Sequence, residues 1–269
     1  MTTRDHKFEI AVNDERIAAT LVAPAAAIPG VLFVHGWGGS QQQYLARARE
    51  IAALGCVGLT FDLRGHVRTE PKQDTVSRED NLNDVLAAYD ELVNHPAVDA
   101  NAIAVVGSSY GGYLAAILTT LRPVRWLALR VPALYKDAGW TLPKKQLHKD
   151  PDLPAYRTRH IPASQNRALK ACAAFKGDIL IVESENDDTV PHPVIENYVE
   201  ASKHAHSLTY RVIAGADHGL SQEPAQRAYT SVLVNWLTEM VFGARQGAPG
   251  AQGSARAGSA PQEAAPHKG

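Results

Sequence analysis

The segment 103–114 reads IAVVGSSYGGYL and carries the strongest fold signal in this 269-residue chain. Its first four residues are apolar and are typical of a buried strand, and a helical pattern follows them to about Leu121. Small residues stand between the two, as a chain requires when a strand turns directly into a helix. The segment therefore predicts a strand–turn–helix unit within a sheet that is covered by helices.

The rest of the chain repeats this alternation. Two short strands, 8–12 and 16–22, flank turn residues at Asn13-Asp14, and the later elements alternate in type. Apolar strands are predicted at 31–34, 57–61, 124–129, 179–182 and 208–213, and helices at about 41–54, 78–93 and 225–241. We therefore predict an α/β fold with a mostly parallel central sheet and helices on both of its faces.

The length of the chain suits one large domain, which we place at residues 1–243. Residues of about 131–176 hold several prolines, many charges and no clear strand, so we predict a small, mostly helical lid insert over the strand ends. Residues 244–269 consist almost entirely of Gly, Ala, Pro, Gln and Ser, and are predicted to form a disordered tail.

Gly107, Ser109 and Gly111 fit the pattern G-x-S-x-G, with Ser109 at its centre. In a strand-to-helix turn the central residue is strained so that its side chain projects above the sheet, and the flanking glycines let the turn close. Both flanking elements are predicted here. We therefore predict that Ser109 is a catalytic nucleophile, the alternative being an ordinary glycine-rich turn.

A serine nucleophile needs a general base within hydrogen-bond reach. Of the histidines that follow Ser109, only His218 lies in a loop just after a late apolar strand, which places it at the carboxyl edge of the sheet. We therefore predict His218 as the base. His204 and His206 share one end of a predicted helix, and a solvated helix terminus is a better interpretation of them than a metal pair.

The base in turn needs an acid that fixes its tautomer. The predicted strand at 179–182 runs into a loop that contains four acids, Glu183, Glu185, Asp187 and Asp188. Asp187 and Asp188 are better placed than Glu183, which can still belong to the strand, and spacing alone does not choose between them. The alternative is that the whole run is a solvated acidic loop.

Acyl transfer also requires backbone N–H groups that stabilise the negative charge on the former carbonyl oxygen. The residue after the serine normally supplies one of them, which here is Tyr110. The glycine-rich segment 35–40, HGWGGS, follows an earlier strand, and we predict that Trp37 supplies the second. A simple tight turn is the alternative, and a dinucleotide loop is disfavoured because G-x-G-x-x-G is absent.

The composition limits the classes of partner. A formal net charge of −1 gives no electrostatic reason to expect nucleic acid or an anionic membrane. The two cysteines, Cys56 and Cys172, are too few for a disulfide framework and favour a reducing compartment. With no apolar leader segment and no run long enough to span a bilayer, a cytoplasmic protein without cofactor or metal is expected.

Together these segments resemble the α/β-hydrolase superfamily of serine hydrolases over roughly residues 28–242. The motifs that carry the resemblance follow one another in the expected order, at 35–39, 62–66, 107–113, 187–191 and 217–219. Related hydrolases often read G-x-x-D-x-x-V-P in the acid loop. Alignment on Val190-Pro191 then implies Asp187 as the catalytic acid, although Ser184 stands where the pattern has glycine.

Two branches of the superfamily look similar to this chain. The run 109–113, SYGGY, resembles the catalytic domain of prolyl-oligopeptidase-type enzymes, but the chain has no room for their β-propeller. The short chain with a small insert looks more like carboxylesterases of the feruloyl-esterase and dienelactone-hydrolase kind. Because Ser109 stands where dienelactone hydrolases have cysteine, we discount that chemistry.

The resemblance and the predicted triad imply a carboxylesterase that acts on a small-molecule ester through an acyl-enzyme. The alternatives are an amidase or acyl-peptidase that uses the same residues, and a non-catalytic binding protein on the same fold. Residues 131–170 hold eight basic and three acidic side chains, which favours anionic or polar acyl groups. A solvated charged surface, or an apolar pocket of Tyr135, Trp140 and Tyr156, is the alternative. The oligomeric state stays open.

Overall fold

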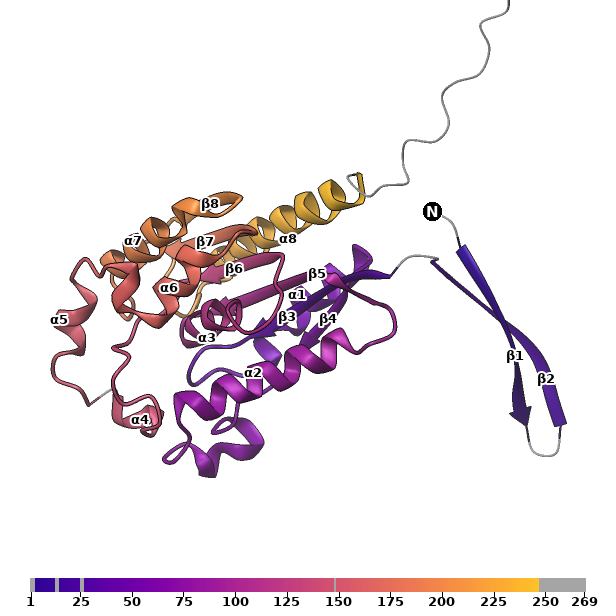
Figure 1. Ribbon diagram of the computed structural model, residues 1–269, viewed down its shortest axis with the longest axis horizontal. Coiled ribbons are helices and arrows are strands. Elements are labelled where there is room, and N and C mark those ends of the chain that lie inside the picture. Colours follow the sequence, from indigo (N-terminus) through magenta and orange to yellow (C-terminus); the bar gives the residue numbers. More distant parts are fainter. Residues whose placement is uncertain (1–2, 13–14, 25–26, 148, 247–269) are drawn as a thin grey trace, which may run out of the picture.

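The fold is seen in a computed structural model, which describes residues 3–12, 15–24, 27–147 and 149–246 (Figure 1). Its centre is a six-stranded, wholly parallel sheet with the strand order β4-β3-β5-β6-β7-β8. The strands are β3 (Ile28–Val34), β4 (Val57–Thr60), β5 (Val98–Ser108), β6 (Trp126–Arg130), β7 (Asp178–Ser184) and β8 (Ser207–Ile213). The predicted parallel α/β sheet is thereby confirmed.

Helices cover both faces of this sheet. Successive side chains of a strand point to opposite faces, so a strand made of consecutive apolar residues has two apolar faces to bury. In β3, Leu32 and Val34 join one buried cluster, whereas Val31 and Phe33 join the other. The first cluster is closed by α2 (Arg78–Val93), α3 (Tyr110–Leu118), α6 (Arg167–Ala174) and α7 (His192–Ala201). The second is closed by α1 (Gln42–Ala53) and α8 (Glu223–Gln246). Two cores therefore hold the strand ends in fixed positions.

The boundary of α2 shows how the sequence sets a helix start. Ser77 accepts a hydrogen bond from the backbone N–H of Asp80, and the Asp80 carboxylate accepts one from the backbone N–H of Ser77. This capping box satisfies two N–H groups that a helix start would leave unpaired. A 3-10 turn, η1 (Val67–Lys72), precedes the helix.

The first two strands, β1 (Thr3–Val12) and β2 (Glu15–Pro24), pair antiparallel in a separate two-stranded sheet (Figure 1). The turn predicted at residues 13–14 lies outside the described residues. At the other end of the chain, α8 continues to Gln246, past residue 243 where the sequence placed the end of the domain. The rest of the predicted tail, 247–269, lies outside the described residues.

The segment between β6 and β7 is built from short helices and turns joined by loops. It contains α4 (Lys144–Leu147), α5 (Leu153–Arg157), the 3-10 turn η2 (Ala163–Gln165) and α6, and a further 3-10 turn, η3 (Ser202–His204), follows α7. Because β6 ends at the carboxyl edge of the sheet, this insert starts beside the strand ends where open α/β folds bind ligands. None of the helices within the described ranges combines the length and apolarity needed to cross a bilayer.

Candidate active site

Ser109 occupies the sharp turn between β5 and α3. Its backbone has φ 53° and ψ −118°, a region that a residue with a side chain rarely adopts. Backbone hydrogen bonds hold this conformation: the Ser109 N–H donates to the Arg130 carbonyl at 2.9 Å, and the Ala133 N–H donates to the Ser109 carbonyl at 3.0 Å. The observed strand–turn–helix therefore has the strained central serine that the G-x-S-x-G pattern predicts.

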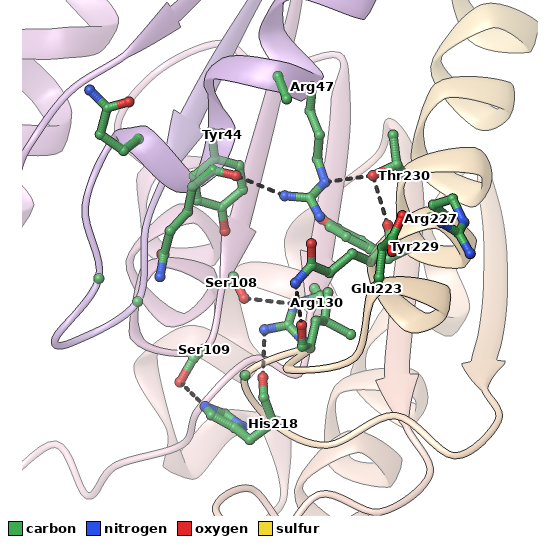
Figure 2. A pocket seen from close by; sticks show the side chains of 18 of the residues that line it. Tyr44, Arg47, Ser108, Ser109, Arg130, His218, Glu223, Arg227, Tyr229 and Thr230 are labelled. Atoms are coloured by element: carbon green, nitrogen blue, oxygen red, sulfur yellow. Dashed lines mark hydrogen bonds and ion pairs between the residues drawn. The ribbon is translucent and has the colours of Figure 1, made fainter.

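His218 and Asp187 reach Ser109 from loops that follow β8 and β7. The His218 Nε2 atom lies 3.0 Å from Ser109 Oγ (Figure 2). On the other side of the ring, His218 Nδ1 lies 2.7 Å from Asp187 Oδ2. A carboxylate accepts hydrogen bonds only, so it favours the tautomer that carries its proton on Nδ1. Nε2 is then free to accept a hydrogen bond from the serine hydroxyl.

The Asp187 carboxylate is buried and is held by its own loop. Its Oδ1 atom accepts hydrogen bonds from the backbone N–H groups of Thr189 at 2.9 Å and Val190 at 2.7 Å. Burial raises the pKa of Asp187, but the hydrogen bonds from His218, Val190 and Thr189 outweigh it and leave this pKa below its ordinary value. The neighbouring Asp188 is exposed and accepts from the Thr189 hydroxyl instead. The structure thus brings Asp187 to the histidine.

The glycine-rich loop after β3 lies directly against the nucleophile. A Cβ atom added to Gly36 would lie 3.2 Å from the Cβ atom of Ser109. The Trp37 ring packs edge-on against the ring of Tyr110, with 5.7 Å between centroids. Trp37 and Tyr110, the two residues predicted to supply oxyanion-hole N–H groups, are therefore neighbours in space. Trp37 follows Gly36 in the loop, and Tyr110 follows Ser109.

Two buried histidines fix the shape of this loop. The Gly38 N–H donates to His66 Nε2 at 3.0 Å, and the Leu63 N–H donates to His35 Nε2 at 3.0 Å. The Nδ1 atom of each ring faces a carbonyl oxygen, so both imidazoles are neutral with the proton on Nδ1. Burial lowers the pKa of His35 and of His66, in agreement with that neutral state.

These two histidines predict a pH dependence of stability. Because their pKa values fall below 6.5 on folding, the unfolded chain binds more protons between the lowered pKa values and 6.5. We expect the free energy of unfolding to rise with pH across this window. The contribution of the two neutral histidines is fully present above pH 6.5 and is lost as the pH falls through their lowered pKa values. Urea unfolding at a series of pH values measures it.

The double variant His35→Gln/His66→Gln isolates this contribution, since glutamine offers an amide oxygen as acceptor but does not titrate in this range. The pKa of His192 is raised, chiefly by its hydrogen bond to Glu183, and contributes the opposite slope. The difference between wild type and double variant therefore reports on His35 and His66 alone. An identical slope in both proteins would contradict the prediction.

Arg130 is a site residue that sequence reasoning missed. This buried arginine ends β6, and its guanidinium donates to Ser108 Oγ at 2.9 Å and to the His218 carbonyl at 2.7 Å (Figure 2). It also donates to Ser184 Oγ at 3.4 Å. It thereby ties the ends of β5 and β7 to the loop that carries the histidine. A charge placed directly after an apolar strand was the available signal, because such a position lies at the ligand-binding edge.

A cavity of about 1000 Å³ opens beside Ser109 and His218 and extends between α1 and α8. Figure 2 shows Tyr44 and Arg47 of α1 on one side of it and Tyr229 and Thr230 of α8 on the other. The Arg47 Nε atom donates to Thr230 Oγ1 at 3.0 Å and so bridges the two helices. The cavity therefore connects the serine with a groove of mixed polar and apolar lining on the α1–α8 face.

Several solved structures share this fold at low sequence identity. A carboxyl esterase from the mycorrhizal fungus Tuber melanosporum matches with a TM-score of 0.58 and 18% identity, over 89% of this chain and 87% of that one. A dienelactone hydrolase from Anabaena variabilis matches with a TM-score of 0.56 and 19% identity, over 88% and 98%. One of the metagenome-derived lipolytic enzymes LipS and LipT matches with a TM-score of 0.61 and 19% identity, over 80% and 95%.

A search of the curated proteins gives no match for the chain. The model of the prolyl oligopeptidase family matches residues 51–243, which is well over half of the sequence and includes the serine turn, the acid loop and the histidine loop. With the α/β-hydrolase fold of the structural neighbours, this match identifies the protein: it belongs to the prolyl oligopeptidase family, within the α/β-hydrolase superfamily of serine hydrolases.

Proposed function

We propose that the protein hydrolyses carboxylic esters through an acyl-enzyme on Ser109. The observation that carries the proposal is the hydrogen-bonded chain from Ser109 Oγ to His218 Nε2 at 3.0 Å and from His218 Nδ1 to Asp187 Oδ2 at 2.7 Å. These distances fall within the range required of a nucleophile, its base and the group that orients the base. The membership of a serine hydrolase family supports the acyl-enzyme on Ser109, and the esterase and lipolytic neighbours support an ester as the substrate.

In the proposed reaction, Ser109 Oγ attacks the ester carbonyl while His218 Nε2 removes the hydroxyl proton. The Asp187 carboxylate stabilises the imidazolium that forms. His218 then returns the proton to the leaving alcohol as the C–O bond of the ester breaks, which leaves the acyl group on Ser109. A water molecule, deprotonated by His218, then attacks the acyl carbonyl. The bond between the acyl carbon and Ser109 Oγ breaks, His218 returns the proton to Oγ, and the carboxylic acid is released.

Negative charge develops on the carbonyl oxygen in both steps, and we assign its stabilisation to the backbone N–H groups of Trp37 and Tyr110. The close approach of Gly36 to Ser109, where an added Cβ atom would lie 3.2 Å from the serine Cβ, supports this assignment because it brings the loop beside the nucleophile. The cavity of about 1000 Å³ suits a small-molecule substrate.

Amide hydrolysis with the same residues is the second candidate, and membership of the prolyl oligopeptidase family favours it. An amine is a poorer leaving group than an alcohol, so an amidase must place the protonated histidine well for the amine nitrogen. Matched p-nitrophenyl esters and p-nitroanilides of the same acyl groups separate the two candidates.

We expect the esters to be cleaved with the higher kcat/KM, and Ser109→Ala to abolish cleavage of both substrate types. Faster cleavage of the anilides would replace the esterase proposal with an amidase. Cleavage that survives in Ser109→Ala would contradict both candidates. If wild type cleaves neither type and binds the substrates without turnover, the chain is a binding protein on this fold.

Arg130→Met is expected to lower kcat by about 10²-fold. Without the hydrogen bond to the His218 carbonyl, the base can move by up to about 1 Å, and a misplacement of that size is enough for such a loss. Methionine keeps much of the length of arginine but donates no hydrogen bond. Steady-state kinetics on a p-nitrophenyl ester gives kcat and KM. The matched control is Arg125→Met at the opposite end of β6, where the exposed guanidinium packs on Trp126. Equal kcat values in the two variants would contradict the assignment.

A further inference from the structure

A lysine of the insert lies in an aromatic cage beside the nucleophile turn. Lys144 opens α4, and its Nζ atom is 4.7 Å from the ring centroid of Trp37, 4.8 Å from that of Tyr110 and 4.7 Å from that of Tyr135. The side chain is fully buried. Three rings within about 6 Å of one ammonium form a site that stabilises a cation through the faces of the rings.

The backbone of the same residue fixes the insert to the body of the domain. The Lys144 N–H donates to the Val76 carbonyl at 2.7 Å, and the preceding Pro143 forms an isolated bridge with Ser77 at the start of α2. The main chain therefore fixes the point from which the Lys144 side chain extends. The insert thus places the Lys144 side chain in the cage while its backbone is bound to the segment before α2.

Two of the three cage residues are the proposed oxyanion-hole donors. Trp37 belongs to the loop after β3 and Tyr110 to the turn after β5, so one side chain contacts both segments. The rings of Trp37 and Tyr110 pack edge-on at 5.7 Å, and those of Tyr110 and Tyr135 at 6.0 Å. The ammonium therefore packs against the side chains of both residues whose backbone N–H groups are proposed to face the reacting oxygen.

This arrangement is costly, which argues against a purely structural role. Burial lowers the pKa of Lys144 well below its ordinary value, and the nearby charges of Arg157 and Arg78 lower it further. An apolar side chain of similar volume fills such a space without the cost of removing an ammonium from water.

We propose that Lys144 is a positioning residue, which holds the backbone of Trp37 and Tyr110 in the geometry that receives the oxyanion. This inference rests on the proposed function, since it assigns a role within the same reaction. It makes the insert part of the catalytic apparatus and not only a cover over the strand ends.

The test compares Lys144→Met with Lys145→Met. Lys145 is the next residue, is half exposed and pairs with Asp74, so its variant removes one lysine from the same helix without touching the cage. We expect Lys144→Met to lower kcat on a p-nitrophenyl ester by about tenfold with KM nearly unchanged, because both N–H donors remain and only their placement is relaxed. Affinity for an alkyl boronic acid, which binds a serine nucleophile as a tetrahedral anion, should fall in parallel.

Hydrogen exchange gives a readout that does not depend on turnover. In Lys144→Met, the amides of segments 36–39 and 109–112 should exchange faster than in wild type, whereas Lys145→Met should leave them unchanged. If wild-type cleavage depends on Ser109 but Lys144→Met keeps kcat and exchange rates, the inference fails and the proposed function stands. If cleavage survives in Ser109→Ala, the proposed function fails, and the exchange rates still decide whether Lys144 orders the two segments.

A second substitution, Lys144→Gln, guards against a folding defect in the methionine variant. Circular dichroism and urea unfolding establish whether each variant folds. Unfolding of both would assign Lys144 to the stability of the domain and would overturn the inference. One folded variant with slower turnover, unchanged KM and faster exchange in the two segments supports it.

Discussion

His218→Ala is expected to lower kcat for ester hydrolysis by about 10⁶-fold, the loss typical when the base of a serine triad is removed. The reason is geometric: His218 Nε2 lies 3.0 Å from Ser109 Oγ and is the group placed to accept its proton. Asp187→Asn should cost less, about 10⁴-fold, since asparagine keeps the shape but no longer selects the tautomer. Steady-state assays on a p-nitrophenyl ester measure the kcat of both variants.

The exposed His206 supplies the matched control, because it pairs with Asp178 at the amino-terminal edge of the sheet. His206→Ala should keep the kcat of wild type. A His218→Ala protein that retains more than about one hundredth of wild-type kcat would contradict the role assigned to this residue.

The second large effect is expected on folding, at Gly111 in the turn after the serine. A Cβ atom at this position would lie 2.2 Å from the Val34 carbonyl oxygen and 2.4 Å from that of His35. Both atoms belong to the backbone at the end of β3, so relief requires α3 to move away from the sheet. We expect Gly111→Ala to lower the free energy of unfolding by about 3 kcal/mol, measured by urea titration.

Gly243→Ala is the control for the added methyl group, since a Cβ atom there meets no atom within 4 Å and the residue lies in α8. Alanine has the higher helix propensity, so this variant should be as stable as wild type or slightly more so. Equal stability of Gly111→Ala and wild type would show that the turn tolerates a side chain, contrary to the packing described here.

The parts of the site that the sequence predicted are those set by local pattern. The strand and helix around Ser109, and the loop after a late strand that holds His218, follow from periodicity and from the rule that parallel strands present their carboxyl ends together. The choice of Asp187 over Asp188 came from a resemblance, and in the structure it is Asp187 Oδ2 that lies 2.7 Å from His218 Nδ1.

The parts that sequence did not predict depend on contacts between distant segments. Arg130 bonds to a carbonyl 88 residues away, and nothing near it in the chain signals that partner. Lys144 looks like one charge among many in a basic insert, yet it is buried between three rings. His35 and His66 appear in motifs, but their neutral tautomers follow only from the hydrogen bonds that their Nε2 atoms accept from backbone N–H groups. Such roles become visible once the fold brings the partners together.

The most direct test of the central claim is the site of covalent labelling by a fluorophosphonate. Intact-mass spectrometry and fragmentation of the peptide that spans residues 108 and 109 locate the adduct. We predict one adduct per chain, on Ser109, and none in Ser109→Ala or in heat-denatured wild type. An adduct on another residue, or an unlabelled protein whose circular dichroism shows an intact fold, would contradict the claim that Ser109 is the nucleophile.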